Sequence, residues 1–66
     1  MIITSIYFNN LKLAYNDPID LMIETGERFL GRYRGDFDSY SFKFYNNTRG
    51  SEEIILLKNL QRLEKQ

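Results

Sequence analysis

The chain has 66 residues and a mass of 7.9 kDa, which predicts one domain over residues 1–66, since typical domains have roughly 100 to 200 residues. It contains no Cys and no His, which excludes disulfides, thiolate metal sites and the commonest general base. Nine basic residues balance nine acidic ones, so no net charge attracts the whole chain to nucleic acid or to an anionic membrane. A nucleic-acid partner would have to bind a local patch.

The longest charge-free stretch, residues 1–11, is shorter than the about 20 apolar residues of a membrane span. It also lacks the basic start of a signal peptide, because the first cation is Lys12. We therefore expect a cytoplasmic protein without a membrane partner. The chain is rich in Ile, Asn, Lys, Phe and Tyr and contains no Val. This composition is typical of A+T-rich genes, so we expect the source to be a low-G+C bacterium, a phage or another mobile element.

Aromatic residues make up 15% of the chain, and turn residues separate short alternating runs, a pattern that predicts an all-β fold. The first two runs, residues 2–8 and 11–15, predict a β-hairpin around Asn9 and Asn10, which tolerate the backbone of a tight turn. Pro18 cannot donate a ladder hydrogen bond, so it predicts the start of the next strand. We expect one strongly bent antiparallel sheet that closes into a small barrel.

The two strands in the middle of the chain can pair in two registers. A loop of residues 25–26 pairs Ile23 with Arg28, whereas a loop of residues 25–27 pairs Ile23 with Phe29. A shift by one residue moves every side chain to the other face of the sheet. The longer loop is the predicted one, because it gathers the large apolar side chains on one face.

Gly35 and Asp36 predict a break or a bulge before the next run, residues 38–45. In that run we expect Tyr40 to point inward together with two phenylalanines, because the three side chains alternate with polar ones. The predicted core consists of Ile19, Leu21, Ile23, Phe29, Tyr33, Phe42 and Phe44.

Residues 54–57 are apolar throughout, which is not expected of a half-exposed strand. We expect both faces of this run to be covered and, since an apolar edge strand invites pairing, we expect a homo-oligomer. Residues 59–66 predict either a short helical turn with Asn59 as its N-cap or a closing strand. In a monomer, Leu60 and Leu63 would be the internal cover.

Few residues are candidates for chemistry. Asp36 and Asp38 have the oxygen ligands that a hard cation prefers, but an Asp near a Gly more often accepts hydrogen bonds from its own turn. Hydroxyl groups such as those of Ser39 and Ser41 have no His to activate them as nucleophiles. We therefore expect a protein that is not an enzyme and that uses no metal or cofactor.

The outward faces of two neighbouring strands carry a local basic patch. Residues of equal parity on a strand point to the same side, and arginines beside an exposed aromatic ring suit phosphates and unstacked bases. The same face also fits a solvated surface, or a protein contact through Met22, Leu30 and Tyr45. The predicted nucleic-acid-binding residues are Arg28, Arg32, Arg34, Lys43 and Tyr45.

Three segments resemble short motifs of a known family. Residues 25–31 place one Gly in a turn and a second Gly five residues later, residues 37–40 read Phe-Asp-Ser-Tyr, and residues 57–59 read Leu-Lys-Asn. These segments make residues 19–66 similar to the Sm-like (Hfq-like) family, whose members are small SH3-like barrels with five strands. The family has an N-terminal helix where this sequence predicts a hairpin.

The resemblance implies an SH3-like or Sm-like barrel that binds RNA or other single-stranded nucleic acid and whose subunits join edge to edge. Without the resemblance, Asp38 is interpreted as part of a turn and Tyr40 as a core aromatic residue. Lys58 is then a cation at the end of a strand, and Asn59 is a helix cap. The alternative function is a protein-interaction module of a phage or mobile element. The positions that the resemblance places near a uridine-binding pore are Asp38, Tyr40, Lys58 and Asn59.

Overall fold

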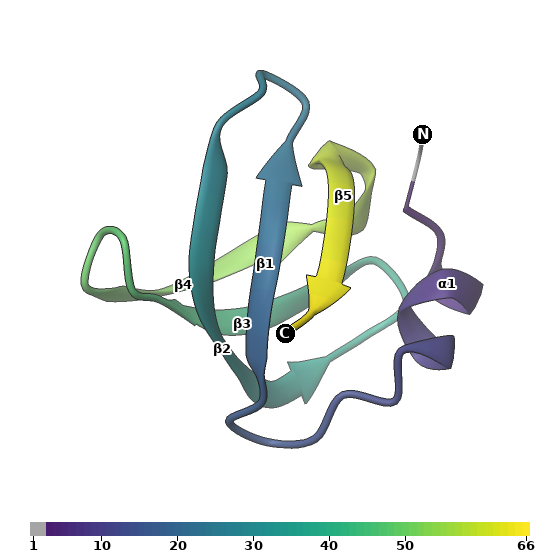
Figure 1. Ribbon diagram of the computed structural model, residues 1–66. Coiled ribbons are helices and arrows are strands. Elements are labelled where there is room, and N and C mark those ends of the chain that lie inside the picture. Colours follow the sequence, from purple (N-terminus) through teal and green to yellow (C-terminus); the bar gives the residue numbers. More distant parts are fainter. Residues whose placement is uncertain (1–2) are drawn as a thin grey trace.

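The computed structural model describes residues 3–66 and arranges most of them in one antiparallel sheet of five strands (Figure 1). The elements are α1 (Ser5–Asn10), β1 (Pro18–Ile23), β2 (Arg28–Phe37), β3 (Ser41–Asn46), β4 (Ser51–Leu56), the 3-10 turn η1 (Leu57–Asn59) and β5 (Leu60–Lys65). The strand order across the sheet is β4-β3-β2-β1-β5. The predicted all-β class and the small antiparallel barrel are confirmed.

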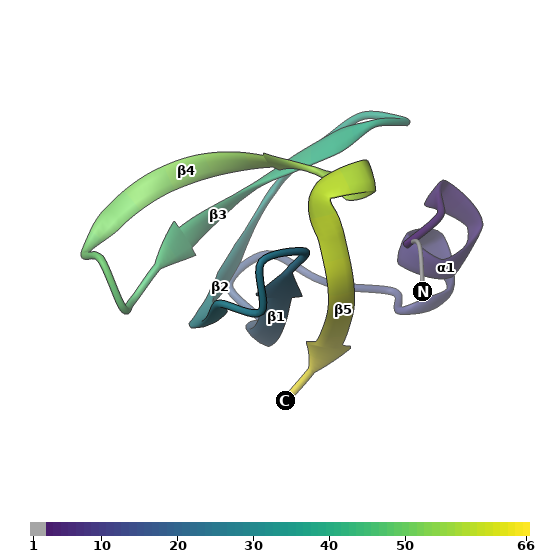
Figure 2. The same cartoon turned by 90° about the horizontal axis from the view of Figure 1, so that it is seen from above.

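Strand β2 is the longest strand and the place where the sheet bends. Its first half pairs with β1 and its second half pairs with β3. Gly35 has a φ of +78°, a left-handed backbone that favours Gly, and the β2–β3 register shifts between Tyr33 and Phe37. The predicted break is therefore a bulge within β2. Seen from above, the sheet curls so that β4 and β5, its edge strands, are joined through η1 (Figure 2).

The pairing of β1 with β2 differs from both predicted registers. The Ile23 amide donates to the Glu27 carbonyl at 2.9 Å, whereas the predicted partner of Ile23 was Phe29, so the loop consists of residues 24–26. Gly26 ends this loop with a φ of +94°, as the left-handed residue of a three-residue hairpin loop does. The loop starts one residue earlier than predicted, which moves the pairing by an even number of residues and keeps every side chain on its predicted face.

The predicted N-terminal β-hairpin is wrong, because α1 occupies that part of the chain. Thr4 is the N-cap of α1, and its hydroxyl accepts a hydrogen bond from the Tyr7 amide at 3.1 Å, which satisfies a free N–H group of the first turn. Ile3 and Phe8 flank this cap and are both buried, as in a hydrophobic staple. The Tyr7 hydroxyl donates to the Leu63 carbonyl of β5 at 2.8 Å, so α1 is fixed against the sheet.

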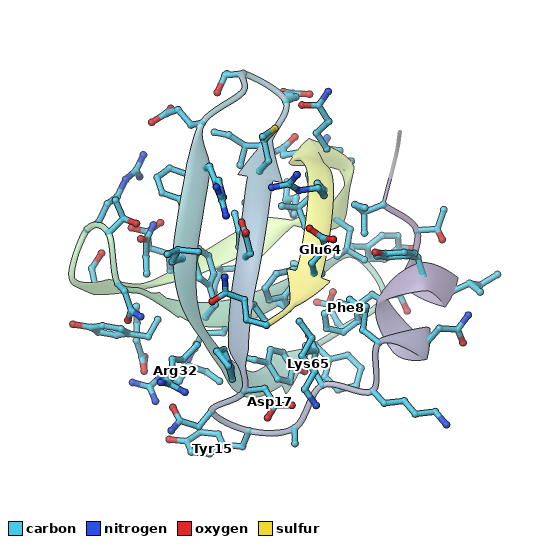
Figure 3. The ribbon with its side chains drawn as sticks, in the orientation of Figure 1. Phe8, Tyr15, Asp17, Arg32, Glu64 and Lys65 are labelled. Carbon is cyan, nitrogen blue, oxygen red and sulfur yellow. The ribbon has the colours of Figure 1, made fainter. Side chains whose placement is uncertain are left out.

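The core lies inside the curled sheet, and α1 covers one end of it, with Phe8 pointing from the helix toward the strands (Figure 3). The centre of the Phe8 ring lies 5.1 Å from that of Phe42 and 5.8 Å from that of Tyr33. The predicted core is confirmed for every member except Ile23, which is half-buried at the end of β1. The buried apolar residues are Ile3, Phe8, Ile19, Leu21, Phe29, Tyr33, Phe42, Phe44, Leu57, Leu60 and Leu63.

The C-terminal segment forms the closing strand β5, one of the two predicted alternatives. Leu60 and Leu63 are both buried although three positions separate them. The β1–β5 register shifts between Met22 and Ile23, and a bulge allows both leucines to point inward. The predicted helical turn is limited to η1, where Asn59 is the last residue and not the N-cap.

Strand β4 lies at the edge of the sheet and carries exposed apolar side chains. Ile54 is 69% exposed and Leu56 is 40% exposed, whereas Ile55 is half-buried against the core. We expected both faces of residues 54–57 to be covered. This expectation is wrong for the face of β4 that carries Ile54 and Leu56, which the described residues leave exposed. Free backbone groups beside exposed apolar side chains form an edge on which another strand can pair.

Candidate nucleic-acid interface

An apolar hollow of about 400 Å³ opens where β4 passes into η1. Three segments that are distant in the sequence meet there, namely the start of α1, the connection between β2 and β3, and the start of η1. The volume lies within the range of small-molecule sites, roughly 300 to 1,000 Å³. We call this hollow the Tyr40 pocket; its lining residues are Ile3, Thr4, Ser5, Ser39, Tyr40, Leu56, Leu57 and Lys58.

The Asp38 side chain positions Tyr40 in this pocket. Its Oδ1 accepts hydrogen bonds from the amides of Tyr40 at 2.7 Å and Ser41 at 2.9 Å, and the bond from Tyr40 is the main cause that lowers the pKa of Asp38 below its ordinary value. This turn delays the start of β3 to Ser41, so the prediction that Tyr40 points inward is wrong, and the residue is 76% exposed. The Tyr40 carbonyl accepts from the Leu57 amide at 2.7 Å, which joins two walls of the pocket.

The four predicted pore positions have different surroundings. Lys58 lines the Tyr40 pocket, is exposed and forms no ion pair with the part of the chain that the structure describes. Asn59 is half-buried outside the pocket, and its carbonyl accepts from the Glu24 amide at 3.0 Å. The structure therefore brings Tyr40 and Lys58 together, whereas Asp38 holds a turn and Asn59 links η1 to the β1–β2 loop.

Arg28 lies apart from the other residues of the predicted basic patch. Its Nε donates to the Asp20 carboxylate at 2.9 Å, and a guanidinium nitrogen of Arg62 lies 3.8 Å from the same carboxylate. The Asp20 side chain is only 7% exposed, and the hydrogen bond from Arg28 is the main cause that lowers its pKa. Arg28, the first residue of β2, therefore neutralises the buried carboxylate of Asp20 on β1.

Arg32, Arg34 and Tyr45 come together on the outer face of β2 and β3, where Tyr15 joins them from the loop before β1. The Arg34 guanidinium lies 5.2 Å from the centre of the Tyr45 ring and 5.8 Å from that of the Tyr15 ring, within the about 6 Å of a cation–π contact. Arg32 lies beside Tyr15 (Figure 3), since its Nη1 donates to the Asn16 carbonyl at 3.1 Å. We call Tyr15, Arg34 and Tyr45 the Tyr15 stack.

Sequence reasoning missed Tyr15, because the predicted hairpin places it in a strand. The loop that carries it is fixed to β2: the Asn16 amide donates to the Tyr33 carbonyl at 2.6 Å, and the Tyr33 amide donates to the Asp17 carbonyl at 2.9 Å. Tyr15 is nevertheless 67% exposed. The sequence signal for such a residue is an aromatic side chain directly before an Asn-Asp-Pro turn.

Lys43 lies on β3 between the Tyr40 pocket and the Tyr15 stack. Its ammonium is 3.6 Å from the Asp36 carboxylate, and it lines a smaller hollow of about 190 Å³ together with the exposed Phe37 and Ile54. Among residues 3–66, no three carboxylates converge in a way that would hold a metal ion.

The side chains predicted for a protein contact are exposed to different degrees. Leu30 is 42% exposed, whereas Met22 and Tyr45 are half-buried. Phe37, Tyr40 and Ile54 are more exposed; sequence reasoning assigned Tyr40 to the pore positions and residues 54–57 to self-association, and it assigned no contact to Phe37.

Comparisons of the chain with protein-family models, with curated proteins and with solved structures find no match. No helix within the described residues is long and apolar enough to cross a membrane. The candidate interface consists of the Tyr40 pocket near one end of β3 and the Tyr15 stack near the other, with Lys43 between them.

Proposed function

We propose that the protein is a non-catalytic binder of RNA or other single-stranded nucleic acid and that a base occupies the Tyr40 pocket. The observation that carries the proposal is the make-up of this pocket: the apolar residues Ile3, Leu56 and Leu57 line it together with Tyr40, which is exposed, and with the basic residue Lys58. Proteins bind single strands through aromatic rings that stack on bases and cations that contact phosphates. The pocket offers both within one hollow.

The polar groups of the Tyr40 pocket suit the same ligand. Ser5 and Ser39 are lining residues with hydroxyl groups, and a hydroxyl both donates to and accepts from base edges, whereas the Thr4 hydroxyl already accepts from the Tyr7 amide. Lys58 supplies one cation for a phosphate oxygen. Because the basic and acidic residues of the chain balance, binding depends on this local chemistry and not on net charge.

The resemblance to the Sm-like family supports the proposal. The N-terminal helix and the five strands of that family have counterparts in α1 and in β1 to β5. Of the positions that the resemblance places at a uridine-binding pore, Tyr40 and Lys58 line the pocket. On these grounds we propose that the barrel is of the SH3-like or Sm-like kind.

Tyr40→Ala is expected to lower the affinity for a labelled single-stranded RNA by about five- to a hundredfold, because stacking contributes roughly 1–3 kcal/mol per base. The RNA should have about 12 nucleotides, within the site sizes of small barrels. Tyr40→Phe keeps the ring and should bind like the wild type. Fluorescence anisotropy measures both variants. A wild-type protein that binds no RNA, or unchanged affinity of Tyr40→Ala, would contradict the proposal and favour the protein-interaction module.

Lys58→Ala tests the phosphate contact in the same assay. Loss of one phosphate contact on a single strand reduces the slope of log affinity against log salt by about 0.7. Lys12→Ala is the matched control, because it removes the same charge from an exposed side chain that, like Lys58, makes no ion pair within residues 3–66. An equal reduction of this slope in the two variants would indicate a general charge effect and would contradict a phosphate contact at the pocket.

We also propose that the protein is a homo-oligomer. Ile54 and Leu56 are exposed on β4, and β4 and β5 are the two free edges of the sheet. An edge of one subunit can therefore pair with the opposite edge of the next, which repeats one interface around an assembly. Such pairing would satisfy the free backbone groups of β4 and place side chains of the next subunit beside Ile54 and Leu56.

Ile54→Lys is expected to give a monomer, because a charged side chain on an edge strand opposes pairing with another strand. Sedimentation velocity over a concentration series measures the change. Ile6→Lys is the control, since Ile6 is similarly exposed, at 71%, but lies on α1. A wild-type chain that sediments as a monomer at every concentration would remove this proposal.

A further inference from the structure

The Tyr40 pocket and the Tyr15 stack are connected along one face of β3. Ser41, Lys43 and Tyr45 alternate with buried residues and so point to the same outer face. Ser41 lies opposite Leu56, a lining residue of the pocket, and Tyr45 belongs to the stack. The strand rises roughly 13 Å between Ser41 and Tyr45, at about 3.3 Å per residue.

Tyr15 presents an exposed ring on a backbone that is held in place. The Arg34 guanidinium packs on the ring, and a Cβ at Gly35 would lie 3.5 Å from Tyr15 Cδ2, so the ring also lies against the backbone of β2. The adjacent Asn16 has a φ of +69° and is hydrogen-bonded to β2. A ring that is fixed from one side and 67% exposed loses little freedom when a flat group stacks on it.

The two arginines near the stack differ in whether a carboxylate already neutralises them. The Nε of Arg34 lies 3.5 Å from the Glu52 carboxylate, so much of the Arg34 charge is balanced. Arg32 donates to a neutral carbonyl and makes no ion pair within residues 3–66. Arg32 is therefore the cation that a phosphate beside Tyr15 would meet.

We infer that the Tyr15 stack is a second base-stacking site and that one single strand crosses β3 from the Tyr40 pocket to Tyr15. Arg32 contacts a phosphate on the way, whereas Lys43, whose ammonium lies 3.6 Å from the Asp36 carboxylate, is already paired. This inference rests on the proposed function and adds to it the path of the strand. A protein with the Tyr40 pocket alone would hold a single nucleotide. A second site at Tyr15 is used only by a strand that is long enough to reach it.

Tyr15→Ala is expected to lower the affinity for the RNA of about 12 nucleotides by about five- to a hundredfold, the range for loss of one stacked base. The same variant should bind a dinucleotide like the wild type, because a dinucleotide fills only the Tyr40 pocket. Tyr40→Ala should weaken both ligands. Tyr15→Phe keeps the ring and should restore wild-type affinity for the longer RNA.

The two proposals fail in different ways. If the wild type binds neither RNA, the proposed function is wrong and this inference falls with it. If Tyr40→Ala weakens the longer RNA but Tyr15→Ala binds it like the wild type, only the inference is overturned. Proton NMR of the wild type gives a readout that needs no variant: the ring signals of Tyr15 should shift with the longer RNA and not with the dinucleotide. Unshifted Tyr15 signals at saturating RNA would also overturn it.

Discussion

Phe8→Ala should lower the free energy of unfolding by about 3–5 kcal/mol, the range for removal of an aromatic side chain from a core. Phe8 is 4% exposed, and its ring contacts those of Tyr33 and Phe42, so the truncation leaves a cavity that α1 cannot fill. A small domain has about 0.05–0.15 kcal/mol of stability per residue, so this loss removes a large share of the total. Urea denaturation followed by far-UV circular dichroism measures it.

Ile6→Ala is the control within the same helix. Ile6 is 71% exposed, and its truncation should change the free energy of unfolding by no more than about 0.5 kcal/mol. In a strand, Ile6 and Phe8 would point to the same face and the two truncations would have similar costs. Similar costs would therefore favour the hairpin over α1.

The N-terminal segment illustrates why the type of an element is hard to predict from a short run. Residues 2–8 are rich in β-branched and aromatic side chains, which favour strands. Ile3, Tyr7 and Leu11, which are four positions apart, also follow a helical period, and Thr4 is a good N-cap. Local propensity does not decide between the two patterns. Packing decides, because the helix buries Phe8 against three other aromatic rings.

The middle of the sheet was predicted more accurately because alternation constrains it. The inward faces of β1, β2 and β3 follow from parity alone, so the core residues from Ile19 to Phe44 were predicted, apart from Ile23, although the register was wrong. The register depends on where the loop begins, and that depends on the left-handed backbone of Gly26. Alternation contains no information on that angle.

The candidate site was less predictable, because it depends on contacts between distant segments. Tyr40 and Lys58 belong to the predicted set, but Ile3 joins them only because α1 begins beside η1. Tyr40 was expected to be in the core, and only the hydrogen bonds to Asp38 show why it is exposed. Tyr15 meets Arg34 because the loop before β1 pairs with β2, and a single sequence does not show that pairing.

Gly31→Ala should lower the free energy of unfolding by about 3 kcal/mol, the upper end of the usual cost of overpacking. A Cβ at Gly31 would lie 2.2 Å from the backbone oxygen of Tyr45 and 3.0 Å from Cδ2 of Phe44. A flexible side chain can move away from a new methyl group, but the Tyr45 carbonyl is part of β3. The methyl group must therefore push β2 and β3 apart at the bend of the sheet. At roughly 4–8 °C per kcal/mol for a domain of this size, thermal denaturation should show a fall in Tm of at least 10 °C.

Gly26→Ala separates the effect of space from that of backbone conformation. Gly26 has nothing within 4 Å of a new Cβ, but its φ is +94°, so the substitution costs about 1–2 kcal/mol through the left-handed backbone alone. Gly31 is not among the residues with positive φ, so the cost there comes from the contact with β3. A Gly31→Ala variant at least as stable as Gly26→Ala would show that β2 and β3 do not approach each other this closely. If Gly31→Ala is destabilised as expected, it should also lower the affinity for the longer RNA, because the displaced strands carry Arg34 and Tyr45 of the Tyr15 stack. The affinity of the folded variant for the dinucleotide should be unchanged.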